Sequence, residues 1–240
     1  VIASGARVSG EEIKGSVIKN WPIKIQMISP QFNLIDVKLP FFCYFTPTLY
    51  TPYFRQVQRM ALKSTIFKAE LQISDMDRNY YQNHALTIAQ HPSETNERMM
   101  IRVLAFAIYA SESLQFTKGL SADDEPDIWQ KNLRDEIELW IDLGQPDEKR
   151  IRKACGRAEQ VVLFTYGGSS ADIWWKKISD KLTRFDNLTV ISIAQAETEL
   201  LANMVERTMQ LQCTIEQGQI WLSMDDKSAE INPVFWQRAG

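Results

Sequence analysis

Eight consecutive residues, EIELWIDL from Glu136 to Leu143, alternate between two chemical characters without a break. The apolar set is Ile137, Leu139, Ile141 and Leu143, and the other set is Glu136, Glu138, Trp140 and Asp142. A period of two predicts a β-strand whose alternate side chains point to opposite faces of a sheet. We expect the apolar face to be buried, so another layer of structure must cover the sheet on that side.

A helix is predicted directly after this strand. Pro146 suits the first helical turn, and Asp147 and Glu148 complement the positive end of a helix. The apolar stripe of this helix follows at helical spacing: Ile151, Ala154, Cys155 and Ala158.

Strands and helices alternate in the same way along residues 60–240. Patterns typical of strands cover residues 62–74, 79–90, 114–117, 160–168 and 188–194. Helical patterns cover residues 170–185 and 196–208, and another helix is predicted to begin after Ser93, a candidate N-cap. The first two strands form a hairpin, and MQLQCTIEQGQIWLSM forms a second hairpin that turns at Gln217-Gly218. The sequence therefore predicts an α/β fold, a mixed sheet flanked by helices, with a mostly parallel centre and antiparallel hairpins at its edges.

The composition excludes several classes of protein. A net charge of −3 gives no overall signature of binding to nucleic acid or to a membrane, so such a partner would need a local patch. No segment approaches the run of about 18 apolar residues that crosses a bilayer, and we expect no membrane partner. The three cysteines lie far apart without a CxxC pair, which favours a reducing compartment, the cytoplasm, and no disulfide.

The pattern changes at Met60. Residues 1–59 contain no long regular period, and their seven basic and three acidic residues give a net charge of +4, which leaves −7 for residues 60–240. A charged region followed by an apolar stretch and a cleavage site, as in a signal peptide, is missing. We expect Met60 to be the natural start and residues 1–59 to be a poorly ordered extension outside the main domain, 60–240.

The acidic face of the strand has two readings. Neighbouring carboxylates on one face lie about 6.6 Å apart and repel unless a cation or basic group sits among them. Lysines and arginines of neighbouring strands could neutralise them at a solvated edge. Alternatively, Asp127 of Pro126-Asp127, together with Glu138 or Asp142, could meet at one end of a sheet, where Glu97 from the preceding helix could complete a Mg²⁺ site.

The helix after Pro146 is strongly basic. Its cations are Lys149, Arg150, Arg152, Lys153 and Arg157. The commoner reading is a solvated cationic face. Beside a metal-binding acidic cluster, however, such cations would bind the phosphates that flank a scissile phosphodiester.

Five long blocks carry a resemblance to a known family. They are MALKSTIFKAELQISDMDRNYY, HPSETNERMMIRVLAFA, GLSADDEPDIWQKN, EIELWIDLGQPDEKRIRKACGRA and YGGSSADIWWKKI, and in this order they resemble the YaeQ family of bacterial proteins over essentially all of residues 60–240. The resemblance implies a variant of the PD-(D/E)xK nuclease fold. It does not extend to residues 1–59.

The resemblance also implies roles for individual residues. Pro126-Asp127 would be the PD element, Glu138 or Asp142 the second acid, and Glu97 the helix-borne acid. The usual lysine is missing, because Trp140 and Gly144 stand two residues after the two candidate acids. Gln145 could orient a water in its place, or Lys149 or Lys153 could reach in from the helix.

Two functions follow as expectations. The first is a Mg²⁺-dependent (or Mn²⁺-dependent) phosphodiesterase acting on DNA or RNA, with Asp127, Glu138 and Asp142 as metal ligands and Gln145 positioning the water. The second is a non-catalytic protein of the same fold that binds nucleic acid or the transcription machinery. The convergence of the acids on one pocket is the feature that separates them. If they formed a bare acidic cluster, Asp142→Asn would leave the metal-free protein unchanged or more stable.

Overall fold

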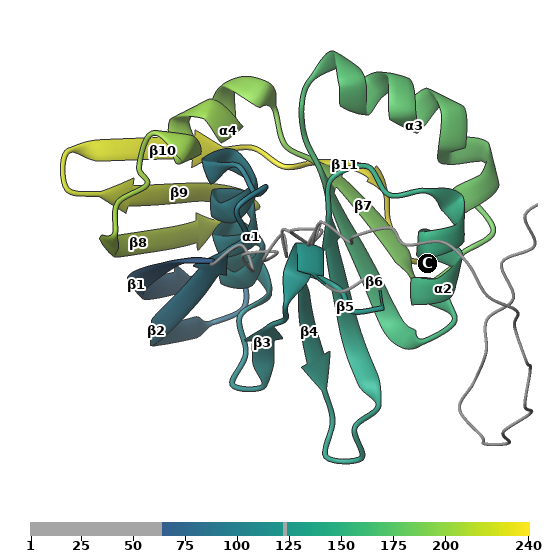
Figure 1. The fold of residues 1–240 in the computed structure, drawn as a ribbon, viewed down its shortest axis with the longest axis horizontal. Coiled ribbons are helices and arrows are strands. Elements are labelled where there is room, and N and C mark those ends of the chain that lie inside the picture. The colour runs from purple at the N-terminus through teal and green to yellow at the C-terminus, as the bar shows by residue number, and fades with distance from the viewer. Residues whose placement is uncertain (1–63, 122–123) are drawn as a thin grey trace, which may run out of the picture. The chain divides into compact units, whose positions relative to one another are not determined.

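Two mixed β-sheets and four α-helices make up the described part of the chain (Figure 1). The structure is a computed structural model that describes residues 64–121 and 124–240. The expectation about residues 1–59 falls outside these ranges. The predicted mixed α/β architecture is confirmed, whereas the division of the strands into two sheets was not predicted.

The first sheet has the strand order β10-β9-β8-β1-β2. Its members are β10 (Lys227–Ile231), β9 (Gln219–Met224), β8 (Thr208–Glu216), β1 (Thr65–Asp75) and β2 (Tyr80–Gln90). Both predicted hairpins, β1–β2 and β8–β9, belong to this sheet, and a parallel pairing of β1 with β8 joins them. Edge hairpins of one sheet were expected, but these two hairpins associate with each other because each has an apolar face to bury on the same helix, α1 (Asn96–Tyr109).

The second sheet has the order β11-β7-β6-β5-β4-β3. Its members are β11 (Val234–Gln237), β7 (Leu188–Ser192), β6 (Ala158–Thr165), β5 (Ile137–Leu143), β4 (Ile128–Lys131) and β3 (Leu114–Phe116). Strands β5, β6 and β7 are parallel, and α2 (Glu148–Cys155) and α3 (Ser169–Leu182) connect them. The parallel centre was predicted, whereas strand β4 was not.

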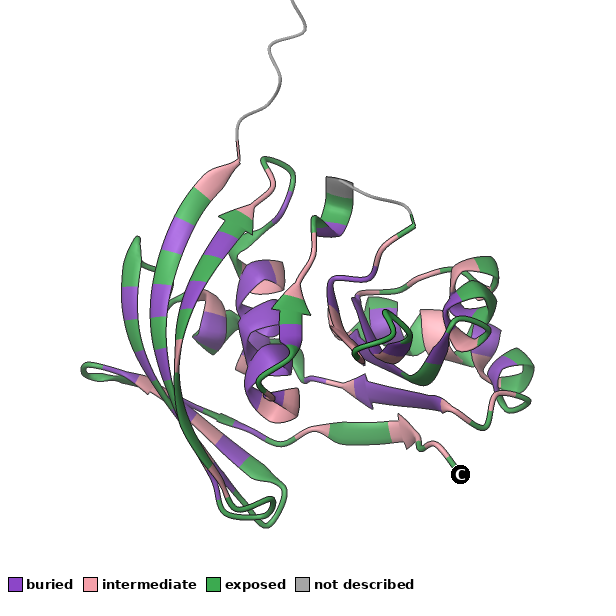
Figure 2. Cartoon of the chain, turned by 90° about the horizontal axis from the view of Figure 1, so that it is seen from below, coloured by how far each residue is buried: buried purple, intermediate pink, exposed green. Residues whose placement is uncertain are grey.

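Helix α1 lies between the two sheets (Figures 1 and 2). All residues from Met99 to Ala107 are buried, because the helix contacts apolar side chains of both sheets. Its N-cap is Thr95, whose hydroxyl accepts a hydrogen bond of 3.1 Å from the backbone N–H of Arg98. The predicted cap, Ser93, instead contacts the ring of His91 in the preceding turn.

The strand β5 is buried on both faces. The four apolar residues predicted to be buried are buried, and Leu139, Ile141 and Leu143 belong to the core around α1. On the opposite face Trp140 packs in a second core with α2 and α3, and Asp142 is only 2% exposed. Of the face that was expected to be acidic, only Glu136, which is exposed, and Glu138, which is half-buried, reach solvent.

Three shorter observations complete the fold. Helix α4 (Gln195–Ala202) ends earlier than the predicted residue 208, because the chain turns at Asn203 towards β8. Among the described residues no helix is both long and apolar enough to span a bilayer. The described cysteines, Cys155 and Cys213, are free thiols, and burial raises their pKa to about 11 and about 12.

Candidate functional site

A cavity of about 250 Å³ lies where β5 ends and the chain enters β4. We call it the central cavity, and its lining residues are Arg98, Gly119, Leu120, Asp127, Asp142, Leu143, Gln145, Pro146 and Arg150. In open α/β sheets, ligands bind outside the carboxyl ends of parallel strands, and the cavity lies at this end of β5. Asp127 and Asp142 thus line one cavity, which is the placement that one of the two readings of the acidic residues expected for this pair.

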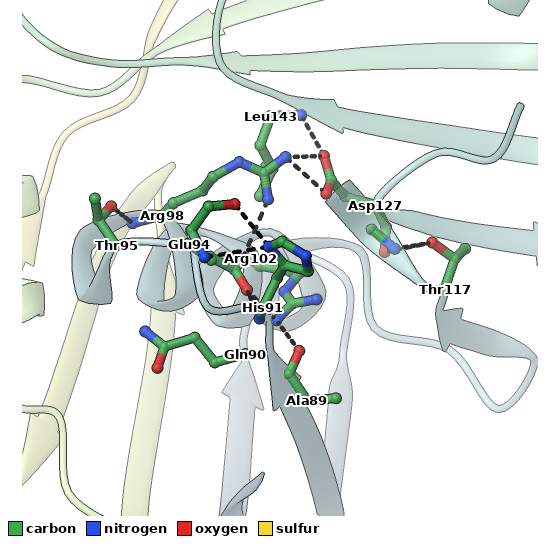
Figure 3. A network of polar contacts seen from close by, with 12 residues as sticks. Ala89, Gln90, His91, Glu94, Thr95, Arg98, Arg102, Thr117, Asp127 and Leu143 are labelled. Carbon is green, nitrogen blue, oxygen red and sulfur yellow. Dashed lines mark hydrogen bonds and ion pairs between the residues drawn. The ribbon is translucent and has the colours of Figure 1, made fainter. Parts of the chain in front are cut away.

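Asp127 is held by Arg98 of α1 and by the end of β5 (Figure 3). The Nη2 atom of Arg98 donates to both carboxylate oxygens at 2.8 Å, and the backbone N–H of Leu143 donates to Oδ2 at 2.9 Å. The side chain is buried. Burial raises the pKa of Asp127, the Arg98 guanidinium opposes this rise, and the carboxylate of Asp142 adds to it. The two carboxylates are therefore close enough to repel each other.

The ion pair continues behind Asp127 into the interior (Figure 3). Glu94 bridges two arginines of α1, accepting from Arg98 Nη1 at 3.1 Å and from Arg102 Nη2 at 3.0 Å. Arg102 also donates to the backbone carbonyl of Ala89, at the end of β2. One chain of charges therefore connects the first sheet, α1 and the second sheet.

Asp142 has its own arginine. Arg150 of α2 donates from Nε to Oδ2 at 2.9 Å and from Nη2 to Oδ1 at 2.8 Å, and Nη2 also donates to the carbonyl of Glu125. This is the two-pronged geometry that guanidinium and carboxylate groups favour. The Arg150 side chain is 30% exposed, so it can reach solvent more easily than Arg98, which is 13% exposed.

The other predicted site residues make different contacts. Glu138 accepts from Gln130 on β4 at 2.8 Å, and Glu97 accepts from the hydroxyl of Thr198 on α4. Gln145 lines the cavity, but its side-chain amide donates to the carbonyl of Tyr166 and to Ser170 Oγ. Neither Glu138 nor Glu97 lines the central cavity.

The basic helix is tied to the acidic segment before β4. Lys153 forms an ion pair with Asp124, and Arg157 donates to the carbonyl of Asp124 at 3.0 Å. Among the described residues, Lys149 and Arg152 form no ion pair, and both are exposed. Three of the five predicted phosphate-binding cations, Arg150, Lys153 and Arg157, thus have acidic or carbonyl partners, and the other two are solvated.

Two functional candidates were missed by the sequence. The first is Arg98, which lies on α1. The sequence pattern of α1 shows an apolar face, but it does not show that this arginine pairs with Asp127, directly before β4 of the second sheet. Tyr166, directly after β6, is the second. Burial raises its pKa to about 12, and the charges of Arg98, Glu97 and Asp127 also act on its phenol, which places it beside the same network.

A second cavity, of about 240 Å³, adjoins the central cavity. We call it the side cavity, and it is lined by Gln145, Pro146, Asp147, Glu148, Trp174, Lys177, Ile178 and Lys181. The two cavities share Gln145 and Pro146. The indole Nε1 of Trp174 donates to the carbonyl of Pro146 at 2.9 Å, which fixes the ring of this α3 residue against the shared wall.

The ligand set for a metal ion is incomplete within the described ranges. Over residues 64–121 and 124–240, no three His, Cys, Asp or Glu side chains are arranged to hold one ion. The two carboxylates at the central cavity each have a guanidinium as counter-charge. The charges of Asp127 and Asp142 are therefore balanced by Arg98 and Arg150, and each arginine could exchange its carboxylate for another anion.

Comparison with known proteins gives the family. The family model described as "YaeQ protein" matches residues 60–233. The uncharacterized protein YaeQ of Escherichia coli (strain K12) is 50% identical over 179 residues, which is 75% of this chain and 99% of that protein, and the protein of the same name from Shigella flexneri matches equally.

Two solved structures are also similar. The YaeQ protein from Xanthomonas axonopodis pv. citri has a TM-score of 0.71 and 48% identity, covering 72% of this chain and 98% of that one. The YaeQ protein from Pseudomonas syringae has the same TM-score at 35% identity, covering 74% and 98%. By its sequence over residues 60–233 and by these relatives, the chain belongs to the YaeQ family.

Proposed function

We propose that this protein binds a short single-stranded stretch of nucleic acid without cleaving it, with one phosphate in the central cavity and the adjoining nucleotide in the side cavity. The observation that carries the proposal is the pairing of both cavity carboxylates with arginines, Asp127 with Arg98 and Asp142 with Arg150. These pairs supply guanidinium groups for a phosphate and leave no free acid for catalysis.

The central cavity suits an anion because an arginine can exchange one oxyanion for another. Guanidinium groups bind phosphate with the same two-pronged geometry that they use for carboxylate. Arg150 is the half-buried partner, so it can turn from Asp142 towards a phosphate at lower cost than Arg98 can leave Asp127. On binding, the contact of Arg150 with Asp142 would be replaced by a charge-assisted contact of Arg150 with the phosphate.

The side cavity suits a base and its phosphate. Trp174, Pro146 and Ile178 give it an apolar wall. Lys177 is exposed and has no ion-pair partner among the described residues, and Lys181 shares Glu148 with Arg184 at 3.4 Å and 2.7 Å. An aromatic ring combined with cations along a groove is the usual means of holding single strands without sequence preference.

The Mg²⁺ or Mn²⁺ ion implied by the resemblance to PD-(D/E)xK nucleases does not fit the side chains as they lie. Both oxygens of each cavity carboxylate accept from an arginine, Glu138 and Glu97 have other partners, and no lysine lines the cavity. The proposed binding therefore involves no metal ion.

A metal-dependent phosphodiesterase is the second candidate, and one observation favours it. Asp127 and Asp142 line the same cavity at the end of β5, and one or two carboxylates with substrate oxygens suffice for Mg²⁺. When bound, such an ion would polarise the phosphate and activate a water. The arginines would first have to release both acids.

The binding proposal is tested with fluorescent single-stranded DNA and RNA of about 12 nucleotides in chelator. We expect binding that weakens with salt. Trp174→Ala and Lys177→Gln should each raise the dissociation constant about tenfold, since stacking on one ring contributes about 1–3 kcal/mol. Lys68→Gln, which removes an exposed charge from β1, should change only the general electrostatic attraction. Equal effects of all three variants, or no binding, would overturn the proposal.

The metal question is tested by melting curves. Because Arg150 would lose its counter-charge, Asp142→Asn should now destabilise the protein, by about 2 kcal/mol for a half-buried pair, and Mg²⁺ should not shift the melting temperature. This reverses the sign expected for a bare acidic cluster. A Mg²⁺-induced rise of several degrees that Asp142→Asn abolishes, together with cleavage of the oligonucleotide, would establish the phosphodiesterase instead.

A further inference from the structure

The four outermost strands of the two sheets differ in how well their free edges are protected. Natural proteins protect edges with short strands, charged residues, proline or bulges. Strand β10 has five residues with a lysine and a glutamate, β3 has three residues, and β11 has four with a register shift. Strand β2 has eleven residues, YYQNHALTIAQ, without Lys, Arg, Asp, Glu or Pro, and pairs with β1 without a bulge.

The register shows which backbone groups of β2 point away from the sheet. The backbone N–H of Lys68 on β1 donates to the carbonyl of Arg207, so it points towards β8 and away from β2. Lys68 and Thr87, which lie opposite each other, are therefore a pair without mutual hydrogen bonds, and the backbone N–H and C=O of Thr87 point away from the sheet. The carbonyl of Ala89 also points away from β1, because it accepts a hydrogen bond from the Arg102 side chain. By alternation, the outward-facing residues are Tyr81, Asn83, Ala85, Thr87 and Ala89.

Most of these outward groups have no partner in the part of the chain that the structure describes. Within residues 64–121 and 124–240, the backbone groups of Tyr81, Asn83, Ala85 and Thr87 have no hydrogen-bond partner beyond the sheet, and only Ala89 is capped, by Arg102. The side chains of the first four are exposed. An open, regular and uncharged edge of this length is a template for another strand.

We propose that β2 pairs with β2 of a second copy of this chain, antiparallel and centred on His84, to form one continuous sheet of ten strands. With this centre, Asn83 lies opposite the partner's Ala85, and Tyr81 lies opposite the partner's Thr87. Each uncapped outward residue meets another, and Ala89 with its arginine stays outside the pairing. The proposal does not depend on the proposed function.

A second copy suits this edge better than an unrelated peptide because the strand complements itself. A two-fold axis places the same surface on both sides, so any charge near the axis would face its own kind. Strand β2 has no acidic or basic residue except His84, whose pKa burial lowers, so the ring stays neutral near pH 7. Small side chains, Asn83 and Ala85, lie beside the axis, where the strands approach most closely.

The test is the molar mass of the full chain in solution. We expect twice the 27.7 kDa of one chain at tens of micromolar. The double substitution Asn83→Glu, Ala85→Glu sets carboxylates opposite carboxylates across the axis and should raise the dissociation constant at least about tenfold. The matched control, Thr208→Glu, Gln212→Glu, adds the same charge to exposed positions of β8, away from the edge, and should leave the dimer intact.

Hydrogen exchange gives a second measurement that does not depend on the variants. The amides of Asn83, Ala85 and Thr87 should become protected as the protein concentration rises, whereas those of Gln82 and Leu86, which face β1, should be protected at every concentration. A chain that is monomeric at about 100 μM, or a dimer that the double substitution leaves unchanged, would overturn the proposal.

Discussion

Asp127→Asn is expected to lower the free energy of unfolding by about 3–5 kcal/mol, because breaking a buried ion pair leaves the remaining charge uncompensated. Arg98 would keep its charge at 13% exposure, and its second partner, Glu94, is shared with Arg102. The loss is measured by chemical denaturation, with the slope of the unfolding curve checked for a change in mechanism.

Two further variants make this result specific. Arg98→Met combined with Asp127→Leu removes both charges at similar volume, and we expect it to recover much of the lost stability. Asp135→Asn removes an acid whose partner is Lys131 and whose side chain is 82% exposed, so the melting curve should hardly move. A near-neutral Asp127→Asn would mean that solvent reaches Arg98, and the argument for a balanced buried network would fail.

Ile141→Ala should also lower stability strongly, by about 2–5 kcal/mol. Ile141 is fully buried on the central strand β5, between Ile128 of β4 and Val162 of β6, so truncation leaves a cavity that three strands would have to close. Ile173→Ala is the control, since that side chain on α3 is 68% exposed. Similar losses for both isoleucines would contradict the assignment of Ile141 to the core.

The sequence predicted β5 and its apolar face well because both depend on the local period of two. Its opposite face was predicted poorly for a physical reason. Whether Trp140 and Asp142 meet water depends on α2 and α3, which cover that face, and alternation within one strand carries no information about such a cover. The same limit applies to the sheets, because the pairing of β1 with β8 depends on segments far apart in the chain.

The candidate site was predicted in part. The meeting of Asp127 with Asp142 could be proposed from the sequence because Pro126-Asp127 stands shortly before the strand that carries Asp142, whereas the pairing of β4 with β5 that brings them together was not predicted. Their arginines could not, because Arg98 comes from a helix 29 residues before Asp127, and its direction is set by packing between two sheets. Arg150 was named in the sequence as one cation of a basic helix near acids, but the commoner reading of that helix was a solvated face, and neither reading identified Asp142 as its partner.

The parallel pairing of β1 with β8 has a consequence for how the chain folds. Lys68 aligns with Thr208, so the first sheet joins residues that are 140 positions apart. Such non-local pairing slows folding, because a long loop must close before its contacts reward it. On the ribosome, the β1–β2 hairpin emerges early and must wait for nearly the whole chain before β8 arrives. Until β8 arrives, the edge of β1 that it will occupy therefore stays open, and we expect chaperones to compete for this edge during synthesis.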